Sequence, residues 1–258
     1  MPRTVPLLST RRGRSKGAPG LSDCTSDCVI VFLRAPDRGY VKTRLARKLG
    51  HQAATDLYRC FVEDLLGMLG STGYPVRLCY TPPDAAARLA SWLGPAYPMM
   101  PQKGADLGDR MADAFLRVFS GGVERALLVG TDVPDLPAER IFSGFAALRH
   151  FPAVLGPVKD GGYCLIGFRA DGFSTDVFAG LPWGSEGVLQ QTLGAFSRRG
   201  QTPRLLESWQ DIDTLEDLAA FWKRVGKTAA APATTTYLAS RFVRPMPGKR
   251  PESALKFD

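Results

Sequence analysis

Histidine and cysteine are scarce in this chain. Its 258 residues include two histidines and five cysteines, and no two cysteines have the C-x-x-C spacing. Because zinc sites are usually built from closely spaced cysteine and histidine ligands, the sequence argues against a zinc site. The scattered thiols are better explained as reduced side chains with structural roles.

Long apolar runs are also absent. No stretch of the sequence approaches the roughly 20 apolar residues that a helix needs to span a bilayer. The basic N-terminal segment is not followed by the apolar segment of about 7–15 residues that a secretory signal peptide contains. The sequence therefore predicts a cytoplasmic protein with no membrane partner.

The central part of the chain has almost no excess of charge of one sign. The formal net charge is +8, but residues 28–226 hold 22 basic and 21 acidic residues, which leaves +1 there. The remaining charge lies in residues 1–27 and 227–258, which are rich in Pro, Gly, Ser, Thr and Ala. This pattern predicts one folded domain, residues 28–226, between two disordered basic tails. The tails could make a weak contact with an anionic partner, but the folded part is not expected to bind nucleic acid.

The clearest sign of a site lies in residues 127–137. An apolar strand ends at Gly130-Thr131, and Asp132 follows directly. In open α/β sheets, ligands bind at the edge formed by the carboxyl ends of the strands, which is where Asp132 would lie. Pro134 and Pro137 stiffen the turn, since a residue before proline is kept out of the helical region, and a carboxylate held there suits Mg²⁺ or Mn²⁺. The alternative is that Asp132 caps a short helix expected at residues 138–149.

A loop at residues 34–45 follows a β-branched strand at residues 28–33 and runs into a helix. Exposed amides and the helix dipole favour an anion there, and Lys42 and Arg44 add positive charge. The loop is neither a Walker sequence nor G-x-G-x-x-G, so ATPase and Rossmann cofactor functions gain no support. Exposed basic residues without a ligand are the alternative. The candidate nucleotide contacts are Arg34, Gly39, Lys42, Thr43 and Arg44.

A second polar loop, residues 101–111, leads into an amphipathic helix that ends near residues 121–122. Gln102 could hydrogen-bond a nucleobase edge, and Gly104 would let backbone approach a flat ring. Arg110 could reach a phosphate. Asp106 and Asp109 are either part of this site or helix-start residues, a role that suits Asp109 better.

Other strands and helices alternate along the chain. Apolar spacing predicts a core-packing helix over residues 51–70, and Val76 opens a short strand that Pro82-Pro83 closes. An alanine-rich helix then extends to Gly94. Two further strands, residues 153–158 and 163–168, flank Asp160-Gly161-Gly162.

The roles of Asp160 and Glu186 have two explanations each. Asp-Gly between apolar runs is a hairpin signal, so Asp160 is either a turn residue or a ligand for sugar hydroxyls. A helix is expected to begin near Ser185 as its N-cap. Glu186 then complements the helix dipole or acts as a general base, and Trp183 is core or a wall of an acceptor pocket.

Two carboxylates, Asp211 and Asp213, stand two residues apart late in the chain. In extended backbone such residues face the same side. Thr214 and Asp217 fit a capping box in which Asp replaces Glu or Gln. Asp217 is therefore expected to be structural, while Asp211 and Asp213 are available for a cation.

Together these stretches resemble the bacterial GT-A-like glycosyltransferases of the nucleotide-diphospho-sugar transferase superfamily, of the type associated with radical-SAM and arsenosugar clusters. That family is related to molybdenum cofactor guanylyltransferase-like proteins. The resemblance covers about residues 28–225, and Leu215 departs from the proline common at that position. The matching pieces are Arg34-Ala35-Pro36, Gly39, Val41-Lys42-Thr43-Arg44-Leu45, Gln102, residues 104–111, Gly130-Thr131-Asp132, Pro134-Asp135-Leu136, Gly156-Pro157, Asp160-Gly161-Gly162-Tyr163, Trp183-Gly184 and Asp211-Ile212-Asp213-Thr214.

The resemblance implies an α/β, Rossmann-like GT-A fold: a mostly parallel central sheet flanked by helices, with an antiparallel hairpin. It also implies a Mg²⁺ or Mn²⁺ ion that holds a nucleotide diphosphate. Asp132 matches the family's metal-binding aspartate, and the Asp211–Asp213 segment matches a later strand end that supplies another ligand, with Asp213 favoured over Asp211.

Three functions are compatible with these residues. The first is glycosyl transfer from a nucleotide-sugar donor to a small-molecule acceptor, with Asp132 and Asp213 on the metal and Asp160 or Glu186 as the base of an inverting reaction. The second is nucleotidyl transfer from a nucleoside triphosphate with release of pyrophosphate, which the first loop favours less because it is not glycine-dense. The third is a catalytically silent nucleotide sensor, which the presence of Asp132, Lys42 and Asp213 disfavours.

Overall fold

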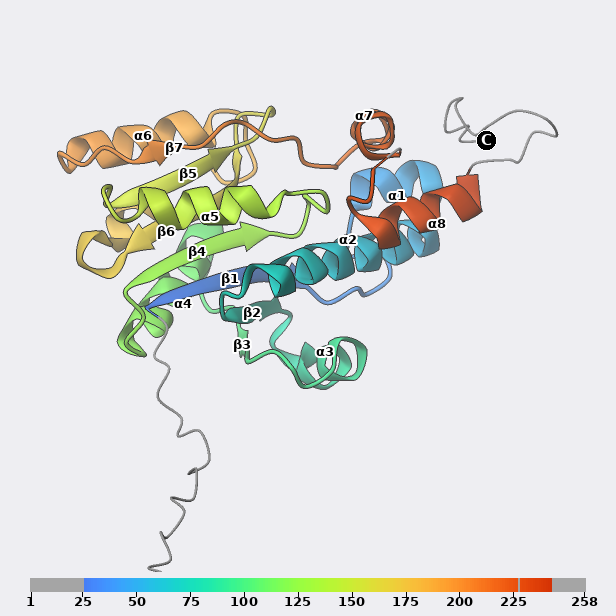
Figure 1. Cartoon of the computed structure of the whole chain (residues 1–258), viewed down its shortest axis with the longest axis horizontal. Helices are drawn as coiled ribbons and strands as arrows, with labels where there is room; N and C mark the ends of the chain where they lie inside the picture. The colour runs from blue at the N-terminus through green and yellow to red at the C-terminus, as the bar shows by residue number, and fades with distance from the viewer. Residues whose placement is uncertain (1–25, 227, 243–258) are drawn as a thin grey trace, which may run out of the picture.

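A mixed sheet forms the centre of the part of the chain that the structure, a computed structural model, describes: residues 26–226 and 228–242 (Figure 1). Its seven strands are β1 Asp27–Arg34, β2 Val76–Thr81, β3 Met99–Pro101, β4 Arg125–Gly130, β5 Ala153–Pro157, β6 Tyr163–Arg169 and β7 Arg204–Leu205. They lie in the order β3-β2-β1-β4-β6-β5-β7. Only β6 runs antiparallel to its neighbours β4 and β5; the other pairs are parallel.

The strand order reverses direction at β1. From β1 the chain first builds outward to β2 and β3, then returns to place β4 on the other side of β1. Such a reversal opens a crevice at the carboxyl ends of the two strands, where open α/β sheets bind their ligands. The α/β fold with one antiparallel hairpin, implied by the resemblance, is confirmed.

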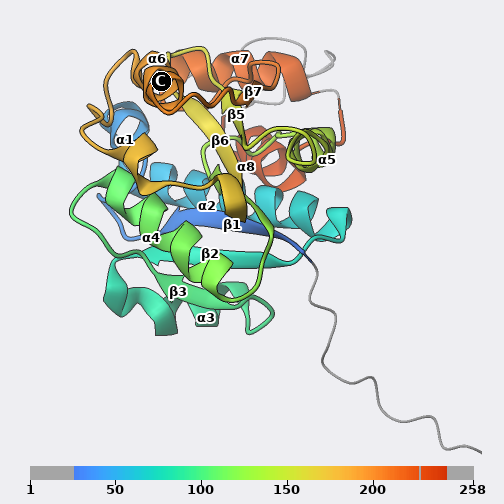
Figure 2. The ribbon, with the colours of Figure 1, turned by 90° about the vertical axis from the view of Figure 1, so that its left-hand side faces the viewer.

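Helices cover both faces of the sheet (Figure 2). They are α1 Thr43–Leu49, α2 His51–Thr72, α3 Ala86–Leu93, α4 Leu107–Ser120, α5 Ala138–Ala147, α6 Val188–Arg198, α7 Leu215–Val225 and α8 Pro232–Phe242, with short 3₁₀ helices η1 Pro83–Ala85, η2 Ala170–Gly172 and η3 Thr175–Phe178. Side chains of α2 and α5 pack on one face of the sheet, and those of α4 and α6 pack on the other.

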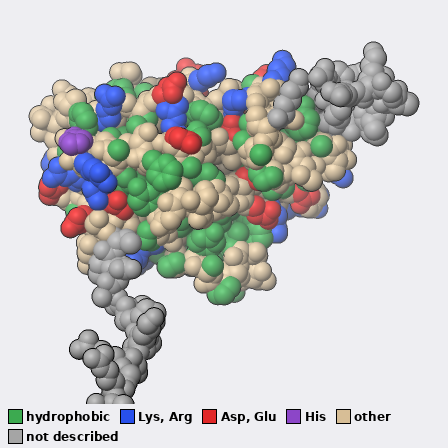
Figure 3. All heavy atoms as spheres, viewed as in Figure 1, with side chains coloured by type: hydrophobic (Ala, Val, Ile, Leu, Met, Phe, Trp, Pro, Cys, Tyr) green, Lys and Arg blue, Asp and Glu red, His purple; other side chains and the backbone are tan. Residues whose placement is uncertain are grey.

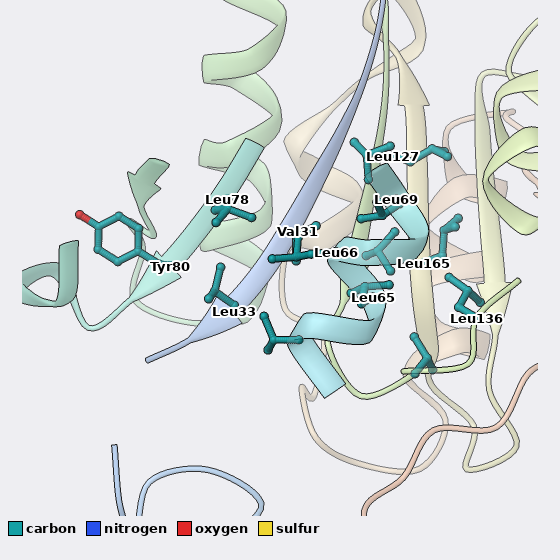
Figure 4. Close-up of a cluster of buried hydrophobic side chains, with 14 of the residues drawn as sticks. Val31, Leu33, Leu65, Leu66, Leu69, Leu78, Tyr80, Leu127, Leu136 and Leu165 are labelled. Carbon is teal, nitrogen blue, oxygen red and sulfur yellow. The ribbon is translucent and has the colours of Figure 1, made fainter. Parts of the chain in front are cut away.

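The alternation of side chains along β1 explains why both faces need a cover. Val29, Val31 and Leu33 point into the cluster with α2 and α5, part of which Figure 4 shows. Cys28, Ile30 and Phe32 point into the cluster with α4 and α6. Successive strand residues face opposite sides, so a strand that is apolar throughout is stable only when it is buried on both faces.

The helix α8 corrects the prediction of one disordered tail over residues 227–258. It packs on α2, and Leu238 is fully buried in a third apolar cluster with residues of α1, α2 and α7. Asp64 of α2 accepts hydrogen bonds from the backbone N–H groups of Ala233 and Thr234, both at 2.8 Å, and so caps α8. This cap lies 170 residues from Thr234 in sequence, beyond the reach of any local pattern. Residues 1–25, 227 and 243–258 of the two tails lie outside the described residues.

Two local predictions at helix starts have opposite outcomes. The capping box of Thr214 and Asp217 is present at the start of α7. Ser185, however, is not the N-cap of α6, which begins at Val188 after Gly187. The Ser185 hydroxyl instead donates to the carbonyl of Pro182 at 2.7 Å, in a turn whose Gly184 and Gly187 have positive φ. Local hydrogen bonding by serine competes with helix formation there.

The described helices include none that is both long and apolar enough to cross a bilayer. On the face shown in Figure 3, acidic and basic side chains are interspersed, in line with the near balance of charge in residues 28–226.

Candidate functional site

A cleft of about 930 Å³ opens at the carboxyl ends of β1 and β4, the place where the strand order reverses. It is lined by residues from the end of β1, the loop before α1, the end of β4, the β5–β6 hairpin, the turn before α6 and the segment before α7. Segments far apart in the sequence therefore meet here. A volume of this size accommodates a ligand such as a nucleotide with a second small molecule.

Three oxygen atoms converge on one positive charge at the floor of this cleft. The ammonium Nζ of Lys42 lies 2.6 Å from Asp132 Oδ1 and 2.9 Å from Asp213 Oδ1. It also donates to the carbonyl of Ile212 at 2.6 Å. The structure thus brings Asp132 and Asp213 to a shared cation, and that cation is a side chain of the protein.

Lys42 is held in place by burial and by its backbone. Its side chain is only 4% exposed, and its φ of 46° puts it in the left-handed region, which a residue other than glycine seldom adopts. It is the N-cap residue of α1, and its carbonyl accepts from the amide of Ala46. Burial lowers the pKa of Lys42, but the charges of Asp132 and Asp213 raise it by more, so the pKa ends above its ordinary value and the ammonium stays protonated.

The loop after β4 is fastened to the segment before α7. The amide of Ile212 donates to the carbonyl of Asp132 at 3.0 Å. Asp135, whose side chain is 1% exposed, accepts from Arg224 Nε at 2.7 Å and from Trp209 Nε1 at 3.4 Å. These contacts fix Asp132 and Asp213 relative to each other. They also show that Asp132 does not cap α5, whose N-cap is Pro137; the capping alternative is wrong.

Asp211 lies beside this cluster and is crowded by negative charge. Burial raises the pKa of its carboxyl to about 6, and the charges of Asp160, Asp213 and Asp132 contribute in the same direction. A carboxyl with such a pKa changes its protonation state close to neutral pH. Asp213, by contrast, is paired with Lys42 and lies 3.6 Å from Arg44 Nη1.

The candidate base-binding loop is only partly in the cleft. Gln102 and Arg110 line it. The amide nitrogen of Gln102 donates to the carbonyls of Cys79 at 3.0 Å and Leu33 at 3.5 Å, so its own carbonyl oxygen is the group left to face a ligand. Arg110 Nε donates to the carbonyl of Gly104.

Three of the predicted contact residues do not line the cleft among the described residues: Gly39, Gly104 and Asp106. Asp106 is the N-cap of α4, where its side chain accepts from the amide of Asp109 at 2.8 Å. Asp109, in the first turn of α4, accepts from the amide of Ala105 at 3.1 Å, so its predicted role at the helix start is confirmed. Asp106 is the N-cap and not a residue of the cleft lining, so its predicted nucleotide contact is wrong. Gly104 and Gly39 adopt positive φ and shape their loops.

The far wall of the cleft is formed by the β5–β6 hairpin and the turn before α6. Asp160 Oδ1 accepts from the amide of Gly162 at 3.0 Å, which identifies it as a turn residue, yet it also lines the cleft together with Glu186. Trp183 and Tyr163 both line the cleft. Trp183 Nε1 is buried without a hydrogen-bond partner among the described residues, whereas the buried Tyr163 hydroxyl interacts with the side chain of Thr192.

Sequence reasoning missed Tyr58, which it placed only on the core face of its helix. Its hydroxyl accepts from the backbone amide of Arg34 at 2.9 Å and from the Thr131 hydroxyl at 3.2 Å. Tyr58 thereby joins the two loops that carry Lys42 and Asp132. A tyrosine among leucines at helical spacing was the only signal, and it is indistinguishable from a packing residue before the fold is known.

The donor set around Lys42 fits a hard divalent cation. Mg²⁺ and Mn²⁺ take oxygen ligands, and Mg²⁺ is typically bound by one or two carboxylates and by substrate phosphates. Two carboxylates and a carbonyl already surround the ammonium. No group of three or more His, Cys, Asp or Glu side chains is arranged to hold a metal in residues 26–226 and 228–242. These oxygen atoms are therefore suited to an ion that substrate phosphates also ligate, and not to an ion whose ligands all come from the protein.

The chain is similar to a bacterial protein family and to proteins of known structure. Residues 65–185 match the family DUF2064, described as an uncharacterized protein conserved in bacteria. A protein from Desulfovibrio desulfuricans G20, provisionally described as a nucleotide-diphospho-sugar transferase, is 36% identical; the match covers 83% of this chain and 94% of that chain, with a TM-score of 0.80. None of the curated proteins matches the chain.

More distant structures share the fold alone. A 4-diphosphocytidyl-2C-methyl-D-erythritol synthase is 14% identical over 77% of this chain and 96% of its own, with a TM-score of 0.51. A cytidylyltransferase from Leptospira borgpetersenii serovar Hardjo-bovis (strain JB197) is 15% identical over 80% of this chain and 89% of its own, with a TM-score of 0.50. Fold by itself does not determine the reaction.

Proposed function

The chain belongs to the same family as the Desulfovibrio nucleotide-diphospho-sugar transferase, and from this premise we propose that it moves a sugar from a nucleotide-diphosphate donor to a small-molecule acceptor with the help of Mg²⁺ or Mn²⁺. The observation that carries the proposal is the convergence of Asp132 and Asp213 on one cation in a cleft that basic side chains also line. Carboxylates and basic groups on one rim are the complement of a metal-bound diphosphate.

Asp132 and Asp213 would hold the metal ion, which when bound offsets the negative charge that develops on the departing nucleoside diphosphate. Arg34, Lys42, Thr43 and Arg44 line the cleft next to these carboxylates. They would bind the phosphates, with Arg34 and Arg44 supplying forked donors. Lys42 and Arg44 flank the start of α1, where the helix dipole also favours an anion.

Gln102 would read the nucleobase through its carbonyl oxygen. Since its amide nitrogen is committed to the carbonyls of Cys79 and Leu33, it can only accept a hydrogen bond from a ligand. The base edge that it faces must therefore present an N–H donor. Arg110 lies in the same lining and could support the ring or a phosphate.

The acceptor would bind against the hairpin and Trp183. The unpartnered indole N–H of Trp183 is suited to a sugar or acceptor oxygen. Asp160 or Glu186 would take the proton from the attacking hydroxyl if the reaction inverts the configuration of the sugar. Of the two, Glu186 is the better candidate, because Asp160 already accepts from the amide of Gly162.

Nucleotidyl transfer is the second candidate. The same carboxylates and basic groups could align a nucleoside triphosphate with a phosphorylated small molecule and release pyrophosphate. The observation in its favour is that a cytidylyltransferase shares the fold. Since this likeness concerns the fold alone, the first candidate is preferred.

A screen of nucleotide sugars against nucleoside triphosphates, each with Mg²⁺, Mn²⁺ or EDTA, separates the two. Metal-dependent release of a nucleoside diphosphate from a sugar donor is the result expected. Pyrophosphate release from a triphosphate would establish the second candidate instead. If neither class of nucleotide binds with any metal, both reactions are excluded.

A further inference from the structure

Lys42 stands where a metal would have to bind. Its ammonium is within 2.6–2.9 Å of Asp132 Oδ1, Asp213 Oδ1 and the Ile212 carbonyl. We propose that Lys42 is a placeholder cation: it neutralises the two carboxylates in the ligand-free protein and moves to the phosphates when a divalent metal and a nucleoside diphosphate bind together. This inference rests on the proposed function and specifies how its site is regulated.

The ammonium and a metal cannot share these oxygen atoms. Mg²⁺ lies at about 2.0–2.1 Å from its ligands, whereas the ammonium nitrogen already lies within hydrogen-bond distance of the same three oxygens. Two cations in that space would repel each other strongly, because burial weakens screening by solvent. One must leave before the other binds.

A metal ion alone is a poor competitor for this position. Displacing Lys42 would leave a buried ammonium without its partners, and removing one partner of a buried ion pair is strongly unfavourable. The side chain is 4% exposed, so water cannot readily replace the lost contacts. The affinity for metal alone should therefore be low.

A diphosphate changes this balance by offering a new partner for the ammonium. Arg34, Thr43 and Arg44 line the same side of the cleft as Lys42, so phosphates bound there lie within reach of its flexible four-carbon stem. Only the side chain has to swing, since the backbone of Lys42 is anchored at the start of α1. The freed carboxylates then receive the metal.

The consequence is a coupling between the two ligands. Whatever factor the nucleotide adds to the metal affinity, the metal must add to the nucleotide affinity, because linkage is reciprocal. The coupling also keeps the ion pair closed until the substrate is present. Because the diphosphate also ligates the metal directly, the part of the coupling that depends on Lys42 is the part that is lost when its charge is removed.

Mn²⁺ binding tests the proposal without any measurement of turnover. Free Mn²⁺ is followed by electron paramagnetic resonance in the full-length protein, alone and with ADP, CDP, GDP or UDP, and the Mn²⁺ bound by each diphosphate in protein-free samples is subtracted. For the natural chain we expect at least about tenfold tighter Mn²⁺ binding when the preferred diphosphate is present, a change of about 1.4 kcal/mol. Equal Mn²⁺ affinity with and without a diphosphate that itself binds would overturn the proposal.

Three variants locate the effect. Lys42→Met keeps the length of the side chain and removes its charge, so it should bind Mn²⁺ alone at least about tenfold more tightly than the natural chain. Lys223→Met, at an exposed position of α7, is the matched control and should leave Mn²⁺ affinity unchanged. In Lys42→Met/Asp213→Asn the gain should disappear, since one of the carboxylates loses its charge. Circular dichroism checks that each variant folds.

The same measurements also distinguish a failure of this inference from a failure of the proposed function. If no diphosphate binds to any form but Lys42→Met still gains Mn²⁺ affinity, Lys42 is a placeholder and the proposed reaction fails. If a diphosphate and metal bind but Lys42→Met binds Mn²⁺ alone no better than the natural chain, the reaction stands and the placeholder role is wrong. Should Lys42→Met fail to fold, Lys42→Gln, which also removes the charge, takes its place in the same comparison.

Discussion

Asp132 and Asp213 experience the same ammonium but different surroundings. The side chain of Asp132 is 46% exposed and that of Asp213 is 36% exposed, so both carboxylates face the cleft while Lys42 lies beneath them. A ligand in the cleft can therefore reach both carboxylates. This arrangement distinguishes a binding site from a buried structural ion pair.

Asp132→Asn should separate binding from folding. The substitution preserves the shape of the side chain and removes its charge, so metal-dependent nucleotide binding should be lost. The protein should stay folded but unfold at a lower temperature, because the buried ammonium of Lys42 loses one of its two carboxylate partners and keeps the other. Calorimetric titration with nucleotide and Mn²⁺ measures the first effect and thermal unfolding the second.

Asp171→Asn provides the control for that measurement, since Asp171 is paired with Arg169 at the surface, far from the cleft lining. It should bind metal and nucleotide like the natural chain. Unchanged nucleotide binding in Asp132→Asn would remove Asp132 from its assigned role.

Asp211 should make the metal-free protein less stable as pH rises. Its pKa is raised to about 6 by burial and by neighbouring carboxylates, above the unfolded value of about 3.9. Between these values the folded state binds more protons than the unfolded state, so this group lowers stability as pH increases, and the full penalty is present above pH 6.

In EDTA, Asp211→Asn should therefore gain stability relative to the natural chain as pH rises from about 4 to 7, by about 1 kcal/mol after allowance for solvent screening. Urea unfolding at each pH measures the difference. A difference that stays constant over this range would show that the carboxyl has an ordinary pKa.

The start of α4 and the turn before α6 are linked by one close contact. A Cβ added at Gly108 would lie 2.8 Å from Trp183 Cζ2 and Nε1 and 2.9 Å from the carbonyl of Phe178. Only glycine lets α4 approach this turn so closely. The contact fixes the position of the loop at residues 101–111 relative to Trp183 in the turn before α6.

Gly108→Ala should displace Trp183 and cost about 1–3 kcal/mol, the usual range for overpacking. Intrinsic tryptophan fluorescence reports the displacement, and urea unfolding reports the free-energy change. Gly67→Ala is the matched control: an added Cβ there meets nothing within 4 Å, and alanine within a helix should stabilise α2 by about 0.5–1 kcal/mol. Equal effects of the two substitutions would contradict the assigned contact.

The whole molecule depends on its C-terminal helix more than its composition indicates. The third apolar cluster is shared by α1, α2, α7 and α8, and α1 carries Arg44 while α7 follows Asp213 directly. A helix remote from the cleft in sequence and space thus supports the two elements that border it.

A chain that ends at residue 226 should be less stable than one that ends at residue 242. Loss of α8 exposes the partners of Leu238, worth about 1.5–3 kcal/mol, and leaves Asp64 buried without the two amides that it caps, worth roughly 1 kcal/mol more. Chemical unfolding of both chains measures this. Equal stability would mean that α8 contributes no packing energy.

Most strands and helices follow from short-range patterns in this sequence. The apolar run that precedes Asp132, the helical spacing within α2 and the capping box at Thr214 were each predicted from neighbouring residues and are present. Two local predictions failed: Ser185 bonds within a turn and does not cap α6, and Asp106 caps α4 and does not line the cleft. In both cases a short polar side chain bonds to nearby backbone, which residue type and spacing alone do not distinguish from another role.

The sequence by itself determined where strands end and which polar residues follow them, because burial patterns, prolines and glycines act over a few residues. It therefore determined the candidate carboxylates, whereas the fold class was implied by the resemblance to a known family. Only the tertiary structure decided that Lys42 lies between Asp132 and Asp213, since Lys42 and Asp213 are 171 residues apart. It likewise decided that α8 is ordered on α2 by Asp64. Contacts over such separations depend on how the packed layers meet, which no local pattern records.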